Sequence, residues 1–154
     1  MFVIRQCRNE HNILRNVRNA LREALAWDIR TIGFNKKLSS IRFVLQSLHR
    51  HFERLMELEE AGGYMVVVDQ IKPNLGPRAK ELRLEHEEFR ALLCKLQPSI
   101  ESLPSIASLS DEEMGCFNRL CDELCGLLNR IDAHEEKEDD LLQEVFLYDE
   151  GGEG

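Results

Sequence analysis

The segment Ile131-Asp-Ala-His-Glu-Glu-Lys-Glu-Asp-Asp-Leu-Leu142 is the most informative part of this sequence. His134 and Glu138 lie four residues apart in it, a spacing that places both side chains on one face of a helix. The same face carries a stripe of apolar residues, namely Leu120, Leu127, Ile131, Leu141 and Val145. Both ionisable side chains are therefore expected to point into a hydrophobic core.

An ionisable pair inside a core needs a partner, because a buried carboxylate without one costs roughly several kcal/mol or takes up a proton. In four-helix bundles, inward-facing His and Glu side chains commonly bind a metal ion. The alternative is that His134 and Glu138 form a pair at the edge of the buried face and bond to a neighbouring helix. Ionisable residues on the other predicted helices are needed to distinguish the two interpretations.

The composition bounds the fold and the partners. The 154 residues fit one domain with one sizeable core. The chain is 43% hydrophobic but only 6% aromatic and has four prolines, which favours helices over sheets. The formal net charge is −8, and no run of Lys and Arg stands apart from acidic neighbours. This charge pattern argues against a nucleic-acid partner and against an anionic membrane surface.

Targeting signals and cysteine usage favour a cytoplasmic location. The apolar run at the N-terminus is too short for a signal peptide, and no stretch approaches the roughly 18 apolar residues of a membrane span. Five cysteines are an odd number, and Cys116, Cys121 and Cys125 are not spaced like a disulfide framework or a zinc-binding pair. We expect them to be small hydrophobic residues on a helix in a reducing compartment.

Four segments repeat apolar residues every three or four positions, as amphipathic helices do. We expect helices near residues 10–26, 40–62, 77–97 and 110–147. This predicts an all-α fold, a single antiparallel up-down-up-down four-helix bundle over residues 1–148. Ser110 and Glu113 form a capping-box pattern at the start of the last helix. The acidic, glycine-rich residues 149–154 are expected to be a disordered tail.

The segments between these helices lack the helical period. Residues 27–35 contain Gly33 and are expected to be a connection, and Gly62-Gly63 is a plausible end of the second helix. Residues 64–71 form a β-branched run with no strand to pair with, so we interpret them as a continuation of the helix followed by a loop.

Other ionisable residues also lie on or beside apolar stripes. Glu59 is almost in line with the stripe of the second helix, whereas His49 and His51 lie at its rims, where histidines are more often solvated or capping than ligating. His11 and His86 lie beside the stripes of the first and third helices. A carboxylate in line with an apolar stripe is as unusual at Glu59 as it is at Glu138.

The two halves of the chain echo each other. Glu10-His11-x-x-Leu14-Arg15 and Glu85-His86-x-x-Phe89-Arg90 share one pattern at an offset of 75, and Glu59 aligns with Glu138 at an offset of 79. Each helical hairpin would then carry an early His on its first helix and a late carboxylate on its second. Folded as a bundle, this pseudo-repeat brings two His and two Glu to one level of the core, as in carboxylate-bridged metal pairs.

These motifs, together with His134-x-x-x-Glu138, resemble those of the hemerythrin-like family of HHE cation-binding domains, over about residues 8–146. The resemblance implies a four-helix bundle with a non-haem di-iron centre. It implies ligand roles for His11, His86 and His134 and bridging roles for Glu59 and Glu138. It further implies a small diatomic ligand and a role in sensing oxygen, peroxide or nitric oxide, or in iron handling.

The sequence departs from the family pattern at two positions. Leu55 stands four residues before Glu59, where the family has a His ligand, and Arg90 stands one turn after His86, where oxygen-carrying members have another His. The site can then hold two metals with open positions or one metal well. The alternative is a metal-free bundle that serves as a protein interaction module.

Competing chemistries lack their motifs. A ferritin-like site requires Glu-x-x-His on two helices, and this chain contains none. Neither a glycine-rich phosphate loop nor a nucleophile elbow is present, so we expect no enzyme activity.

Overall fold

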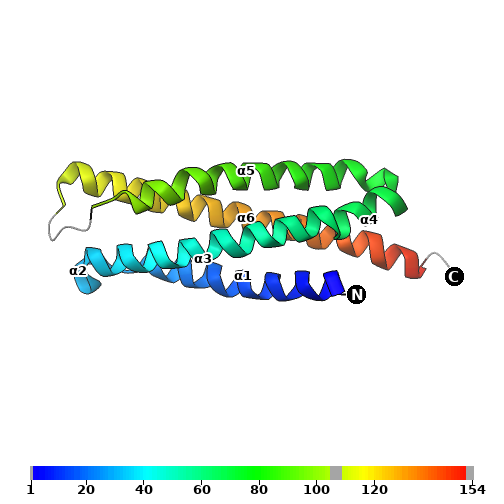
Figure 1. The fold of residues 1–154 in the computed structure, drawn as a ribbon, viewed down its shortest axis with the longest axis horizontal. Helices are drawn as coiled ribbons and strands as arrows, with labels where there is room; N and C mark the ends of the chain where they lie inside the picture. The colour runs from blue at the N-terminus through cyan, green and yellow to red at the C-terminus, as the bar shows by residue number, and fades with distance from the viewer. Residues whose placement is uncertain (1, 105–108, 152–154) are drawn as a thin grey trace.

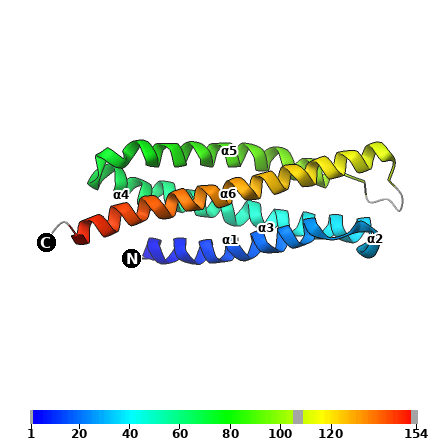
Figure 2. The ribbon, with the colours of Figure 1, turned by 180° about the vertical axis from the view of Figure 1, so that it is seen from behind.

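The computed structural model describes residues 2–104 and 109–151, and in these ranges it contains helices and no strands. Its four long helices are α1 (Phe2–Ala26), α3 (Phe34–Ala61), α5 (Gly76–Glu101) and α6 (Asp111–Gly151). Consecutive long helices run in opposite directions along the molecule (Figures 1 and 2). The predicted all-α bundle is confirmed, and its helices follow the expected up-down-up-down course.

The helices are longer than their apolar stripes indicate. Two predicted helix starts are wrong. Helix α1 begins at Phe2 and not near residue 10, and α3 begins at Phe34 and not near residue 40. Nor does α5 end before Pro98. Ile100, beyond that proline, is completely buried, and Arg42 donates hydrogen bonds to the carbonyls of Ile100, Glu101 and Leu103 at the helix end. These contacts satisfy carbonyl groups that a helix terminus otherwise leaves without partners.

The predicted connection at residues 27–35 contains a single helical turn, α2 (Ile29–Ile32). Asp28 caps this turn by accepting a hydrogen bond from the backbone N–H of Arg30 at 2.9 Å. Gly33 then adopts a φ of 94°, which favours glycine. Buried Lys37 donates to the carbonyls of Leu25 and Trp27, both at 2.8 Å, so a cation stabilises the C-terminal end of α1.

The predicted break at Gly62-Gly63 is confirmed, and residues 64–71 form a separate helix, α4 (Tyr64–Ile71), followed by the short helix η1 (Pro73–Leu75). A Cβ atom on Gly63 would lie 2.8 Å from the Cα of Glu59 and 2.8 Å from the carbonyl oxygen of Leu58. Glycine therefore allows α4 to fold back against the last turn of α3. This close approach brings the first residue of α4 to the level of Glu59.

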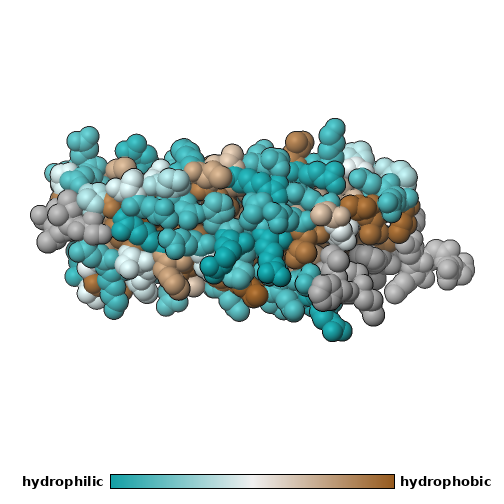
Figure 3. All heavy atoms as spheres, in the orientation of Figure 1, coloured by the Kyte–Doolittle hydropathy of each residue, from teal (hydrophilic) through white to brown (hydrophobic). Residues whose placement is uncertain are grey.

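The core runs the length of the bundle in two parts. The larger part is built mainly from leucines of all four long helices. A smaller part lies under α4, where Met65 and Val68 pack with Ala79, Leu82, Leu141 and Val145. The face in Figure 3 is largely hydrophilic, with apolar side chains gathered near the end where α4 lies. In the described ranges, no helix combines the length and the apolar character that crossing a membrane requires.

Helix α6 confirms one sequence prediction and corrects another. Ser110 Oγ accepts a hydrogen bond from the Glu113 backbone N–H at 3.1 Å, and Glu113 Oε1 accepts one from the Ser110 backbone N–H at 3.3 Å, so the capping box forms. Helix α6 continues to Gly151, so it includes the first residues of the segment 149–154 that was expected to be a tail. The rest of that tail, residues 152–154, lies outside the described residues.

Candidate metal centre

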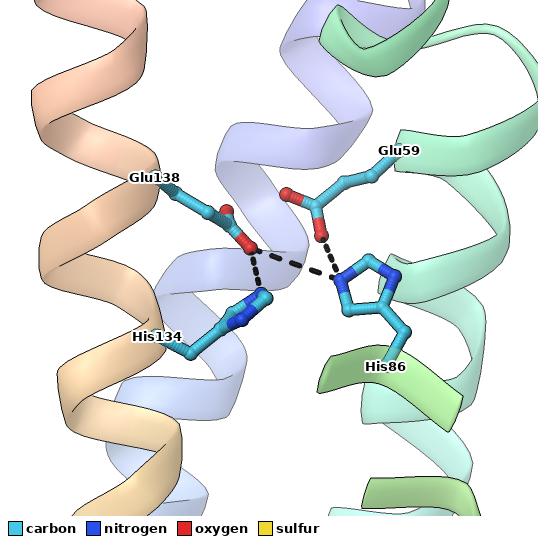
Figure 4. Close-up of side chains that lie close together, drawn as sticks. All are labelled: Glu59, His86, His134 and Glu138. Atoms are coloured by element: carbon cyan, nitrogen blue, oxygen red, sulfur yellow. Dashed lines mark ion pairs between the residues drawn. The ribbon is translucent and has the colours of Figure 1, made fainter. Parts of the chain in front are cut away.

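Four buried ionisable side chains meet in the core of the bundle: Glu59 from α3, His86 from α5, and His134 and Glu138 from α6. Each offers one ligand atom, and these atoms all lie within 4.8 Å of one another. Figure 4 shows the two carboxylates pointing toward each other, with both imidazole rings close by. The largest exposed fraction among the four residues is only 2%. The predicted inward orientation of His134 and Glu138 is confirmed.

The ligand atoms of this cluster face one another without satisfying one another fully. His86 Nε2 lies 3.4 Å from Glu59 Oε1 and 3.8 Å from Glu138 Oε1, and His134 Nε2 contacts Glu138 Oε1 (Figure 4). Within the described part of the chain, four of these buried atoms have no hydrogen-bond partner, namely His86 Nε2, His134 Nε2, Glu59 Oε1 and Glu138 Oε2. Buried polar atoms are normally paired, so this concentration of exceptions indicates a ligand-binding site.

His11 approaches the same cluster from α1. Its Nε2 lies 3.5 Å from Glu59 Oε2 and 3.7 Å from Glu138 Oε2. Its side chain is 27% exposed, whereas those of the other four residues are almost fully buried. All five residues that the sequence resemblance singled out therefore lie together, with His11 on the side open to solvent.

Each of the three histidines is held at its other ring nitrogen by an outer carboxylate. The Nδ1 atoms of His11, His86 and His134 lie 3.3, 2.9 and 3.4 Å from oxygens of Glu135, Glu60 and Glu85, respectively. An ionised carboxylate only accepts hydrogen bonds, so Nδ1 must carry the proton in each contact. Each Nε2 is then directed inward, as in carboxylate–histidine–metal arrangements.

A cation holds each outer carboxylate in turn. Arg18 donates to both oxygens of Glu135 at 2.8 and 2.5 Å. Lys137 lies 3.2 Å from Glu85 on the surface. Burial alone would raise the pKa of Glu135, but hydrogen bonds from His11 and Arg18 outweigh it and lower that pKa to about 2. Glu135 is thereby kept ionised and able to accept a hydrogen bond from His11.

Arg90 is the cation that holds Glu60, the outer carboxylate of His86. It donates to Glu60 Oε1 at 2.8 Å and to Glu60 Oε2 at 3.0 Å. Burial opposes ionisation of Glu60, but the hydrogen bonds from Arg90 and His86 lower its pKa. Arg90 therefore supports His86 through Glu60.

Burial and contacts among the inner residues shift their pKa values. Burial and the negative charge of Glu138 raise the pKa of Glu59 to about 7. Burial opposes protonation of His11 and His86, but Glu135 and Glu138, respectively, outweigh it and raise both pKa values to about 10. Burial also opposes ionisation of Glu138, whose pKa is nevertheless lowered by its contacts with His134 and His86.

Three further residues considered from the sequence lie outside this cluster. Leu55 is buried among the apolar residues of the main core, as its side chain demands. His51 Nδ1 lies 3.1 Å from Glu10 Oε2, and His49 contacts Gln97. The rim position predicted for both histidines agrees with these contacts away from the site.

Sequence reasoning missed the outer carboxylates and Tyr64. Each outer acid is adjacent in sequence to a residue of the inner cluster: Glu60 follows Glu59, Glu85 precedes His86, and Glu135 follows His134. A second acid beside each candidate ligand was the available signal. No sequence signal pointed to Tyr64, whose buried hydroxyl has no hydrogen-bond partner among the described residues.

A cavity of about 660 Å³ opens beside the cluster between α1, α4 and α6. His11 and Glu59 form part of its wall, and Tyr64 and Cys7 lie next to them. A small molecule in this cavity would reach two residues of the cluster directly.

The comparison with protein families gives one match. The family model for the hemerythrin HHE cation binding domain matches residues 3–146, which is nearly the whole chain. No curated protein and no solved structure matches the chain.

Proposed function

The chain belongs to the hemerythrin HHE cation-binding family, and we propose that it is a non-haem iron protein that binds one or two iron ions through His11, Glu59, His86, His134 and Glu138. We further propose that it senses oxygen, peroxide or nitric oxide, or takes part in iron handling. In this proposal it is a binding protein and not an enzyme, and it works in the cytoplasm.

The observation that carries the proposal is the inward orientation of three imidazoles whose outer nitrogens are already occupied. Their Nε2 atoms converge on two buried carboxylates, and four atoms in this group have no hydrogen-bond partner among the described residues. Imidazole and carboxylate donors suit iron, and no cysteine belongs to the cluster. The donor set therefore fits the metal that the family implies.

The number of donor residues favours open coordination positions on a bound metal. Three imidazoles and two carboxylates are fewer ligands than two octahedral ions take up, because Leu55 and Arg90 supply none. Bound iron would supply redox chemistry and positions for a small diatomic ligand. The protein residues orient the imidazoles, hold the protons on Nδ1 and bury Glu59, His86, His134 and Glu138.

Elemental analysis tests the proposal. Protein purified without a tag or chelator, and then reconstituted anaerobically with ferrous iron, should hold one or two irons per chain. His134→Ala should lose most of this iron, whereas His49→Ala, which alters a rim histidine bonded to Gln97, should keep it. An iron-free wild-type chain after reconstitution would refute the proposal and favour the metal-free interaction module instead.

A further inference from the structure

Tyr64 is a polar group in the core region that the proposed iron ligation does not use. Its hydroxyl oxygen is buried and has no hydrogen-bond partner in the described part of the chain. Leaving a buried donor without a partner destabilises the folded protein, so such a group is rarely kept without a use. Tyr64 is the first residue of α4 and therefore sits at the point where the chain turns back from α3.

The turn before Tyr64 fixes the place of its ring. Because Gly63 has no Cβ, the backbone there packs directly against the last turn of α3, at Leu58 and Glu59. Tyr64 shares the wall of the 660 Å³ cavity with Glu59 and His11. The phenol thus lies where the cavity meets the candidate metal centre.

A tyrosine side chain ordinarily keeps its phenolic proton at neutral pH. A phenol that keeps its proton offers an O–H donor to an incoming acceptor. The wall carries charges of both signs, because Arg8 and Arg15 of α1 line the cavity together with Glu135 and Asp139 of α6.

We propose that Tyr64 is a specificity-determining residue that donates a hydrogen bond to a small anion or oxygen ligand bound in this cavity beside His11 and Glu59. This inference rests on the proposed iron centre and adds to it a named donor and a route of entry. The ligand class is a small acceptor that carries negative charge or gains it on binding the metal, since a phenol recognises such an acceptor most strongly.

Azide is a suitable probe, because it is a small anion whose binding to ferric protein can be followed by visible absorption. The titration compares wild-type protein with Tyr64→Phe, which removes one oxygen and keeps the ring. Loss of a hydrogen bond to a charged ligand should weaken azide binding by on the order of 10- to 100-fold. The control is His49→Ala, which removes a rim histidine that contacts Gln97 and should bind azide like the wild type.

Iron content, measured on every sample, separates the possible failures. Equal iron content and equal azide affinity in wild type and Tyr64→Phe would overturn the role of Tyr64 while leaving the iron centre intact. A long-wavelength absorption band in azide-free ferric protein that Tyr64→Phe abolishes would also overturn it, because Tyr64 would then be a metal-bound phenolate and no donor. Iron loss in Tyr64→Phe would show a structural role instead. A wild-type chain that takes up no iron would refute both proposals.

Discussion

Replacing Glu60 by Gln should weaken metal binding although Glu60 is not among the proposed ligands. Glu60 accepts a hydrogen bond from His86 Nδ1 at 2.9 Å and is itself held by Arg90. An amide presents a weaker acceptor and removes the charge, so the His86 ring loses its fixed orientation and part of its basicity. Changes to such outer partners typically cost about 10- to 100-fold in metal affinity, which corresponds to about 1.4–2.8 kcal/mol. Because the Glu60 side chain is 22% exposed, we expect a value at the lower end.

Glu53→Gln is the matched control. Glu53 also accepts from Arg90, at 3.0 Å, but no hydrogen bond or ion pair joins it to a histidine of the cluster. Competition with a chromophoric chelator measures the ferrous affinity of wild type and of both variants, and circular dichroism checks that each is folded. Glu60→Gln should lower the affinity, and Glu53→Gln should leave it within about twofold. Equal effects of the two substitutions would refute the carboxylate–histidine argument, because general loss of the Arg90 network would then explain both.

Three further predictions concern the core, the turn before α4 and protons. Leu55→His should destabilise the metal-free protein by about 2–4 kcal/mol, because it buries an imidazole among apolar residues. Thermal unfolding with and without ferrous iron measures the loss of stability. If ferrous iron does not restore the stability of the variant, a second metal position at α3 is excluded. Gly63→Ala should cost about 1–3 kcal/mol, since its Cβ meets the Glu59 Cα at 2.8 Å; an unchanged melting temperature would contradict this. Iron affinity should rise as the pH increases from 7 towards 10, because His11 and His86 have pKa values raised to about 10 and must lose protons to bind metal. Calorimetry in buffers of different ionisation enthalpy measures the number of protons released when iron binds. A release of zero would show that these imidazoles are already neutral.

The inner cluster could be predicted because its signals are local. The spacing of His134 and Glu138 places both on one helical face whatever the rest of the chain does. Glu59 stands out for the same reason, as a carboxylate in line with an apolar stripe. An antiparallel bundle then brings these faces together, and the structure places their ligand atoms within 4.8 Å. The helix type, the Gly62-Gly63 break and the capping box likewise depend on neighbouring residues only.

The outer carboxylates could not be predicted in the same way, because each acts across a helix interface. Glu135 lies beside His134 in sequence but holds His11, and Glu85 lies beside His86 but holds His134. On a helical wheel these acids belong to a charged face that is normally solvated. Their pairing depends on the rotation of each helix about its axis, which is set by packing of the whole core. The same holds for Tyr64, whose position follows from the close contact at Gly63.

Helix α3 differs from the other three long helices in what it gives to the cluster. On α3, the histidine with a carboxylate partner is His51, whose Nδ1 contacts Glu10. Arg54 also contacts Glu10, at 3.2 Å. His51 precedes Glu59 by eight residues, which is about 12 Å along a helix, so it lies too far away to serve the same metal. One turn before Glu59, Leu55 closes that side of the cluster with hydrocarbon.

The other side of Glu59 is open. The cavity wall includes Gly62, Gly63 and Tyr64, which follow Glu59 along the chain. Leu55 and the cavity therefore lie on opposite sides of one carboxylate. A ligand that enters from the α4 side meets His11 and Glu59, the part of the cluster poorest in nitrogen donors. If the cluster holds iron, His11 and Glu59 would therefore be the residues of the site that a small molecule in the cavity reaches, whereas the side chains of His86 and His134 are buried.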